Sequence, residues 1–167
     1  MIYYITGGTR SGKSSYAQQL ALSLSPVPIY VATARRWDKD LEGRIARHIQ
    51  DRGSEWQTVE EEKSPSAITL KGRVMLIDCV TLWLTNLFMD FDQEVDLSLD
   101  FFKREIDKLQ TLDNTYIIVS NEIGMGVHGE TAVVRKFTDL QGWANQYVAK
   151  VANEAIFMVS GIPMKLK

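Results

Sequence analysis

Several features that define special classes of protein are missing from this sequence. Its 167 residues contain one cysteine, Cys79, which excludes an intramolecular disulfide and favours a reducing compartment. The net charge of −2 gives no overall positive field that would attract nucleic acid or an anionic membrane. No apolar run approaches the roughly 18 residues of a membrane span, and the first residues reach glycines too early for a signal peptide. We therefore expect a cytoplasmic protein with no nucleic-acid partner and no membrane span.

Linker-like segments are also missing. The chain has only four prolines and eleven glycines, and no stretch rich in serine, glycine and proline is long enough to separate two domains. Its 45% hydrophobic and 24% charged residues are typical of an ordinary globular protein. A chain of this length fits one hydrophobic core. The sequence predicts a single domain over residues 1–167.

Short apolar segments alternate along the chain with longer segments that favour helices. The expected strands are 2–6, 28–33, 73–79, 115–120 and 155–160. The expected helices are 13–24, 38–51, 80–89, 97–112 and 131–153. Nearly continuous apolar strands are typical of parallel sheets that are buried on both faces. The pattern predicts an α/β fold with a mainly parallel sheet flanked by helices and a ligand crevice beyond the carboxyl ends of the strands.

The first such strand end carries a phosphate-binding motif, G-x-x-x-x-G-K-[ST], or Walker A. The motif comprises Gly7, Gly8, Thr9, Arg10, Ser11, Gly12, Lys13 and Ser14. Its backbone N–H groups and the following helix N-terminus suit a phosphate. Lys13 would reach the β- and γ-phosphates, and the Ser14 hydroxyl would bind the Mg²⁺ that accompanies ATP or GTP. The sequence predicts nucleotide binding with Mg²⁺ and no tightly bound metal.

Three acidic residues compete for roles in such a site. Asp78 ends an apolar segment and suits the carboxylate on the Mg²⁺ side of a nucleotide. Glu122, just past another expected strand, suits the same role or that of a general base, and a structural turn acid is the alternative. Composition alone makes Glu60 a solvated acid within a short acidic cluster. Asp78 is therefore the main candidate and Glu122 a possible second acid.

A histidine lies on a basic stripe of the expected helix that starts at residue 38. Arg44, His48 and Arg52 recur every four residues beside an apolar stripe. A neutral imidazole between two guanidinium groups suits a nucleophile that attacks an α-phosphate. Spacing alone, however, favours a structural histidine. His128 follows a Gly-Met-Gly loop without a supporting constellation, and we interpret it as a loop residue.

Taken together, these motifs form a series that resembles the bifunctional adenosylcobinamide kinase / adenosylcobinamide-phosphate guanylyltransferase family of cobalamin biosynthesis. The resemblance covers essentially the whole chain. Its blocks are residues 7–14, 30–33, 44–48 followed by Arg52 and Trp56, 78–86, 121–126, 135–139, 145–146 and 160–163. One departure is the segment after Gly126, which lacks the proline expected there.

This resemblance implies a P-loop NTPase with a RecA-like sheet, assembled as a homotrimer. It also implies a kinase and nucleotidyltransferase that catalyses two reactions. The γ-phosphate of ATP or GTP would first be transferred to adenosylcobinamide, with Lys13 as a catalytic residue. GMP from GTP would then be transferred through a GMP-His48 intermediate to adenosylcobinamide phosphate, giving adenosylcobinamide-GDP.

The resemblance further implies nucleotide contacts outside the phosphate-binding motif. These residues are Ala32, Thr33, Ala34, Ile49, Gln50, Asp51, Arg52, Glu60 and Asp78. Ser14 and Asp78 would hold the Mg²⁺ that arrives with the nucleotide. No residues that would contact the corrinoid are predicted.

Two other functions stay open from the residues alone. A P-loop kinase for another small metabolite would make His48 dispensable. A non-catalytic nucleotide-binding regulator would show slow hydrolysis and no acceptor-dependent product. In the bifunctional case, one nucleotide pose can hardly bring the α-phosphorus to His48 and the γ-phosphorus to Lys13. We then expect two binding modes, two sites, or a movement of residues 38–52.

Overall fold

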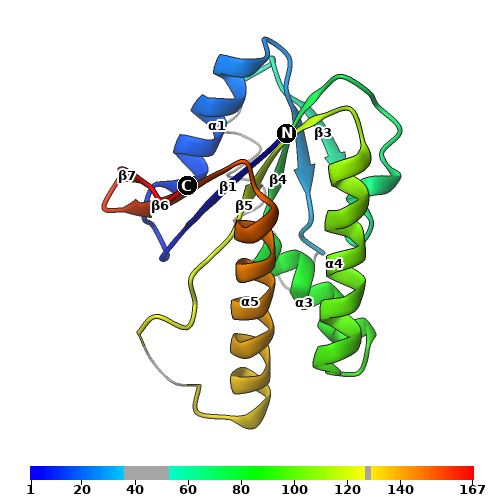
Figure 1. The fold of residues 1–167 in the computed structure, drawn as a ribbon, viewed down its shortest axis with the longest axis vertical. Coiled ribbons are helices and arrows are strands. Elements are labelled where there is room, and N and C mark those ends of the chain that lie inside the picture. The colour runs from blue at the N-terminus through cyan, green and yellow to red at the C-terminus, as the bar shows by residue number, and fades with distance from the viewer. Residues whose placement is uncertain (36–52, 127–128) are drawn as a thin grey trace.

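The structure is a computed structural model that describes residues 1–35, 53–126 and 129–167. Within these residues, seven strands form one sheet in the order β3-β2-β4-β5-β1-β6-β7 (Figure 1). The strands are β1 (Ile2–Gly7), β2 (Ile29–Ala32), β3 (Gln57–Glu60), β4 (Val74–Asp78), β5 (Thr115–Val119), β6 (Glu154–Val159) and β7 (Ile162–Lys165). Neighbouring strands are parallel except β6 and β7, which pair antiparallel. The predicted mainly parallel sheet is confirmed.

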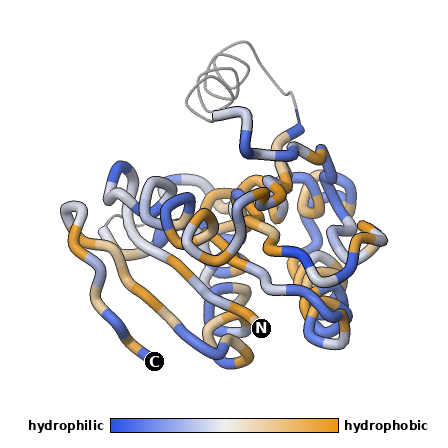
Figure 2. Tube along the Cα trace, turned by 90° about the horizontal axis from the view of Figure 1, so that it is seen from above, coloured by the Kyte–Doolittle hydropathy of each residue, from blue (hydrophilic) through white to orange (hydrophobic). Residues whose placement is uncertain are grey.

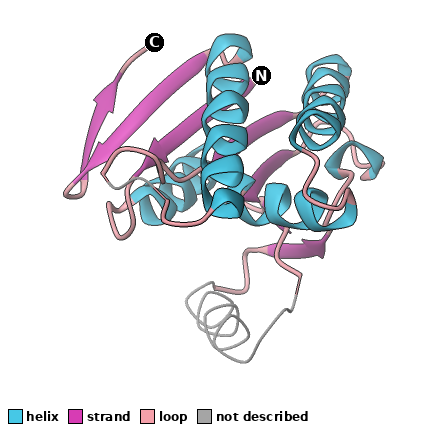
Figure 3. Ribbon diagram, turned by 90° about the horizontal axis from the view of Figure 1, so that it is seen from below, coloured by secondary structure: helices cyan, strands magenta, loops and turns pink. Residues whose placement is uncertain are grey.

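Helices cover both faces of this sheet, as Figure 3 shows. The described helices are α1 (Lys13–Leu24), the short 3-10 helix η1 (Pro65–Ala67), α3 (Val80–Asp90), α4 (Val95–Thr111) and α5 (Ala132–Val151). α1 packs on one face through Ala17 and Ala21, and α3, α4 and α5 pack on the other. No helix among the described residues combines the length and the apolar character that crossing a membrane requires. The expected helix 38–51 lies outside the described residues.

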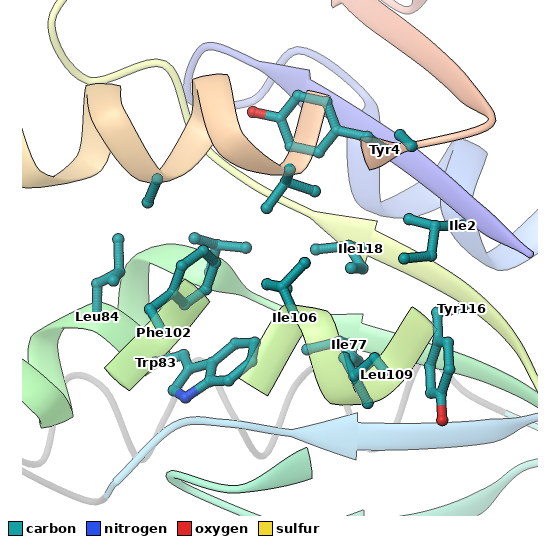
Figure 4. Packing of buried hydrophobic residues seen from close by; sticks show 14 of the residues in the cluster. Ile2, Tyr4, Ile77, Trp83, Leu84, Phe102, Ile106, Leu109, Tyr116 and Ile118 are labelled. Carbon is teal, nitrogen blue, oxygen red and sulfur yellow. The ribbon is translucent and has the colours of Figure 1, made fainter. Parts of the chain in front are cut away.

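Successive residues of the central strands belong to two separate cores. In β4, Met75 and Ile77 join the larger core beneath α3, α4 and α5, while Val74 and Leu76 join the smaller core beneath α1. Trp83 and Phe102 fill the middle of the larger core, 4.7 Å apart between ring centroids (Figure 4). Because both faces of a strand are buried, both of its side-chain rows are apolar. Figure 2 shows these hydrophobic stretches along the central strands and mixed hydropathy along the helices.

The register aligns the predicted site residues at the carboxyl ends of the parallel strands. Ala32 of β2 pairs with Glu60 on one side and with Asp78 on the other. Asp78 pairs with Val119, which pairs with Ile5 of β1. These residues form one row near the carboxyl ends of parallel strands, where α/β folds bind their ligands. The phosphate-binding motif follows β1, which lies two strands from β4 and Asp78. The strand order therefore places the motif at the same carboxyl ends.

Two strands have no counterpart in the sequence prediction. β3 reads Gln-Thr-Val-Glu and is largely exposed at one edge of the sheet, and β7 is exposed at the other. β7 also contains Pro163, and proline within a sheet is typical of edge strands because it cannot donate a backbone hydrogen bond. Edge strands do not need apolar residues on both sides, so neither strand carries the pattern that identified the five central ones.

Candidate functional site

The phosphate-binding motif forms a loop between β1 and α1. Ser11 N–H donates to the Gly8 carbonyl at 3.3 Å, and Gly12 caps α1 with a φ of 92°. A Cβ at Gly12 would lie 3.0 Å from Gly161 Cα, and one at Gly7 would lie 2.6 Å from the Met158 carbonyl oxygen. Glycine is thus required at both positions because the chain from β6 to β7 packs directly behind the loop. The N-terminus of α1 then lies where a bound phosphate is stabilised.

Lys13 lies folded over this loop. Its side chain is buried, and Nζ donates to the Gly8 carbonyl at 2.9 Å. Desolvation lowers the pKa of Lys13, and the negative charge of nearby Asp78 acts in the opposite direction. An ammonium group that is poorly hydrated and has one carbonyl partner is well placed to exchange that partner for phosphate oxygens. Ser14, half-buried, follows it in the first turn of α1.

Asp78 ends β4 at the same edge. Its Oδ2 accepts a hydrogen bond at 2.9 Å from the hydroxyl of Tyr30 on the neighbouring strand. The Ser14 hydroxyl and the Asp78 carboxylate supply oxygen ligands, which are the donors that Mg²⁺ prefers. The donor set of these two residues therefore fits the Mg²⁺ of a bound nucleotide.

Thr33 links the end of β2 to the start of α3. Its hydroxyl donates to the Cys79 carbonyl and accepts from the Cys79 N–H, both at 2.9 Å, and it is fully buried. Its own carbonyl accepts a hydrogen bond from Asn86 at 2.7 Å. These contacts fix the backbone on which the half-buried Ala32 and Ala34 lie. Burial raises the pKa of the Cys79 thiol to about 12, so this thiol is a poor nucleophile.

A charged cluster lies farther along the edge. The Arg35 guanidinium donates to both carboxylate oxygens of Asp90 at 3.0 and 3.1 Å and to Glu62 at 2.7 Å. Lys63 Nζ lies 2.6 Å from Asp90. Hydrogen bonds from Arg35 and Lys63 lower the pKa of Asp90 to about 2. Glu60, at the end of β3, lies in the same strand row as Asp78 and is exposed.

Glu122 lies against the phosphate-binding loop. Its N–H donates to the Gly7 carbonyl at 3.1 Å, and its Oε1 accepts from Thr6 Oγ1 at 2.7 Å and from Asn145 Nδ2 at 3.0 Å. The structure thus brings Glu122 to the edge that also holds Lys13 and Asp78. Neither Thr6 nor Asn145 was a predicted site residue.

One sequence signal indicates Asn145. Leu140, Ala144 and Val148 form the buried stripe of α5, and Gln141 and Asn145 are buried beside them. Two adjacent amide side chains on the buried face of an amphipathic helix require hydrogen-bonding partners. That requirement marks the position, although it does not identify Glu122 as the partner.

Some predicted residues lie outside the described part of the chain. They are Arg44, His48, Ile49, Gln50, Asp51 and Arg52, together with His128. The described site therefore contains the phosphate-binding loop, Asp78, Glu60 and Glu122, together with the backbone around Thr33.

Comparison with known proteins gives matches over nearly the whole chain. The model of a family described as "Cobinamide kinase / cobinamide phosphate guanyltransferase" matches residues 3–166. The bifunctional adenosylcobalamin biosynthesis protein CobP of Pseudomonas aeruginosa is 39% identical over 169 residues, covering 98% of this chain and 95% of CobP. The bifunctional adenosylcobalamin biosynthesis proteins CobU of Escherichia coli and Salmonella typhimurium are 36% and 32% identical, with full coverage of both chains.

A solved structure supports the fold. An ATPase from the type III secretion system of pathogenic bacteria superposes with a TM-score of 0.56 at 10% sequence identity. The match covers 98% of this chain and 56% of that ATPase. At this identity the similarity concerns the fold alone, and it agrees with the predicted RecA-like P-loop class.

Proposed function

The chain belongs to the cobinamide kinase / cobinamide phosphate guanyltransferase family, and from this premise we propose how its residues divide two reactions. The chain is a bifunctional kinase and guanylyltransferase of adenosylcobalamin biosynthesis. In the first reaction, ATP or GTP phosphorylates adenosylcobinamide. In the second, GMP from GTP is transferred to adenosylcobinamide phosphate, giving adenosylcobinamide-GDP. The observation that carries the proposal is the family match over residues 3–166, joined to a complete phosphate-binding loop.

For the kinase step, the phosphate-binding loop and Lys13 hold the β- and γ-phosphates. Ser14 and Asp78 would hold Mg²⁺, which neutralises charge that develops on the phosphate oxygens. The acceptor hydroxyl attacks the γ-phosphorus, the bond to the β-γ bridging oxygen breaks, and the nucleoside diphosphate leaves. Glu122, which contacts the loop through Gly7, accepts the hydroxyl proton.

For the guanylyltransferase step, His48 attacks the α-phosphorus of GTP and pyrophosphate leaves. A phosphate oxygen of adenosylcobinamide phosphate then attacks the phosphorus of the GMP-histidine and breaks the P–N bond. The role of His48 comes from the resemblance to the family, as do nucleotide contacts by Ile49, Gln50, Asp51 and Arg52. The same resemblance supports contacts by Ala32, Thr33, Ala34 and Glu60.

The assembly and setting form part of the same proposal. We expect a single domain over residues 1–167 that associates as a homotrimer, which sedimentation equilibrium would test. The single cysteine fits a cytoplasmic enzyme. A monomer at micromolar concentration would contradict the proposed trimer without affecting the assignment of the two reactions.

Labelled GTP separates the two reactions. Wild type and His48→Ala are incubated with Mg²⁺ and GTP carrying label on the α- or the γ-phosphate, and are then denatured. We expect acid-labile, alkali-stable α-label on the wild type and none on His48→Ala. Both proteins should pass γ-label to adenosylcobinamide. Wild-type protein without α-label, but with γ-transfer, would reduce the enzyme to a kinase, and absence of both would leave a nucleotide-binding regulator.

A further inference from the structure

We propose that Thr6 and Asn145 are positioning residues for the kinase step because they hold the Glu122 carboxylate at the phosphate-binding loop. This inference rests on the proposed function, in which Glu122 accepts the proton of the acceptor hydroxyl. It concerns a buried polar cluster, defined here as Thr6, Ser120, Gln141 and Asn145, that lies between the sheet and α5. The cluster binds Glu122 from the side of the sheet opposite to α1.

Two elements fix Glu122 in place. Its main chain is tied to the end of β1 through Gly7, and its side chain is tied to Thr6 of the same strand and to Asn145 of α5. Both side-chain hydrogen bonds end on Oε1. An ionised carboxylate only accepts hydrogen bonds, and the Thr6 hydroxyl and the Asn145 amide both donate to it. These contacts do not use Oε2, which can take the proton of an acceptor hydroxyl.

The amide of Asn145 is itself held in one orientation. Its Oδ1 accepts from Ser120 Oγ at 2.6 Å and from Gln141 Nε2 at 2.9 Å. Its Nδ2 donates to the Asn121 carbonyl at 3.0 Å and to Glu122. A flipped amide would turn its NH₂ group toward the NH₂ group of Gln141 and its oxygen toward the Asn121 carbonyl and the Glu122 carboxylate, and it would lose these three contacts. Asn145 therefore always presents a donor to Glu122.

Packing alone does not account for this cluster. Ser120, Gln141 and Asn145 are each less than a tenth exposed and lie beside the apolar stripe of α5, where an apolar residue would also fill the space. Buried polar groups are costly unless they are paired, and the hydrogen bonds that link Ser120, Gln141 and Asn145 favour one arrangement, with Gln141 Oε1 left without a partner among the described residues. The one charged member of this network is Glu122, at the loop that binds phosphate. The network thus directs its rigidity to the acid that the kinase step uses.

The test compares substitutions that conserve the size of the side chain and change its hydrogen bonding, with a matched control for the charge that Asn→Asp can introduce. Thr6→Val removes the donor at constant shape, and Thr6→Ser keeps it. Asn145→Asp keeps the size of the side chain and removes the donor to Glu122. Asn114→Asp is the matched control, because Asn114 is equally buried and donates to the Leu70 carbonyl and accepts from Arg73, away from Glu122. Each protein is assayed for γ-phosphate transfer to adenosylcobinamide and for GMP transfer to supplied adenosylcobinamide phosphate.

We expect the kcat of the kinase reaction to fall about 10-fold in Thr6→Val and about 10- to 100-fold in Asn145→Asp, less than the roughly 10²- to 10⁴-fold contributed by a general base, because the base is misplaced but still present. The KM for nucleotide and the rate of GMP transfer should change less than about twofold. Thr6→Ser should retain the kinase rate, and Asn114→Asp should lower both activities equally or neither. In a Glu122→Gln background, the Thr6 and Asn145 substitutions should cause no further loss.

Other results would overturn the inference. They are equal losses of both activities in Thr6→Val, unchanged kinase rates in both variants, or losses that add to that of Glu122→Gln. If the proposed function itself is wrong, the wild type transfers no phosphate to adenosylcobinamide. Each result that overturns the inference, by contrast, requires an active wild type, so the two failures can be told apart. Thr6→Val also guards against misfolding, because it introduces no charge and conserves the volume of the side chain.

Discussion

The phosphate-binding loop and the Glu122 cluster, which is Glu122 with the buried polar cluster that holds it, adjoin each other at the carboxyl ends of the strands, but they are built in different ways. The loop consists of eight consecutive residues, and it offers mainly backbone N–H groups to its ligand. The Glu122 cluster takes Thr6 from β1, Ser120 from the end of β5, and Gln141 and Asn145 from α5. It offers a single carboxylate, which side chains hold in place.

This difference predicts different responses to substitution. Most side chains of the loop can change without loss of its backbone donors. Gly7 and Gly12 cannot be replaced because a Cβ has no space there, and Lys13 cannot because its own charge is needed. In the Glu122 cluster, Thr6 and Asn145 each supply one of the two side-chain hydrogen bonds to Glu122, so each change removes part of the function. Substitutions at a few positions of the loop should therefore abolish kinase activity, whereas substitutions at several positions of the Glu122 cluster should each lower it in part.

The largest effect is expected at Lys13. Lys13→Met keeps the length of the side chain and removes the charge that we propose contacts the γ-phosphate. We expect kinase turnover to fall about 10³-fold, as for other losses of transition-state charge stabilisation. Steady-state kinetics with adenosylcobinamide measures it, with Lys63→Met, in the distant Asp90 cluster, as the control. Retention of more than a tenth of the activity would mean that the backbone donors of the loop suffice.

The next effect is expected at Glu122. Glu122→Gln keeps the shape and Oε1 as an acceptor but removes the proton acceptor, so kinase turnover should fall about 10²-fold. Nucleotide affinity, measured by isothermal titration calorimetry, should stay within about twofold because the loop is unchanged. A large loss of affinity with unchanged turnover would instead make Glu122 part of the nucleotide site, and the two regions would no longer be distinct.

A smaller effect separates two glycines of the loop. Gly12→Ala places a Cβ at a φ of 92° and 3.0 Å from Gly161 Cα, whereas a Cβ at Gly8 meets nothing within 4 Å. We expect Gly12→Ala to lower the free energy of unfolding by about 1–3 kcal/mol. Gly8→Ala should change it by less than about 0.5 kcal/mol. Urea unfolding without nucleotide measures both, and equal effects would contradict the tight packing of the β6–β7 connection behind the loop.

The same contrast explains which parts of the site were predictable from sequence. The loop, α1 and the five central strands depend on local patterns: a motif, a helix start at Lys13, and apolar runs. The structure confirms all of them. β3 and β7 were missed because exposed edge strands do not carry those patterns.

The Glu122 cluster depends on contacts that no local sequence pattern encodes. Thr6 and Glu122 lie 116 residues apart in sequence and meet because β1 pairs with β5. Likewise, Glu60, Ala32 and Asp78 share one row only through the strand order. The resemblance to a family supplied Glu60 where composition had indicated a solvated acid. A reader of the sequence could locate Glu122 at a strand end but not find its hydrogen-bonding partners.

The smallest effect is expected in the Asp90 cluster, defined as Arg35, Glu62, Lys63 and Asp90, whose described contacts are ion pairs at the surface. Hydrogen bonds from Arg35 and Lys63 lower the pKa of Asp90 to about 2, from the ordinary value of about 3.8 for an aspartate. A depressed pKa stabilises the fold fully above about pH 4, and the contribution is lost as pH falls from there to about 2. The side chain is 28% exposed, so solvent screening limits its value to about 0.5–1 kcal/mol.

Asp90→Asn should therefore lower the free energy of unfolding by that amount at pH 7 and by nothing measurable near pH 2. Urea unfolding across this range, at 0.15 M and 1 M salt, measures the difference, which should shrink at high salt. Asp100→Asn, on the exposed face of α4, is the control for loss of a surface charge. Kinase turnover should change less than about twofold, because the cluster contacts neither Lys13 nor Glu122 through its ion pairs. A large loss of turnover at unchanged stability would mean that the functional site extends beyond the phosphate-binding loop and the Glu122 cluster to Asp90 at the end of α3.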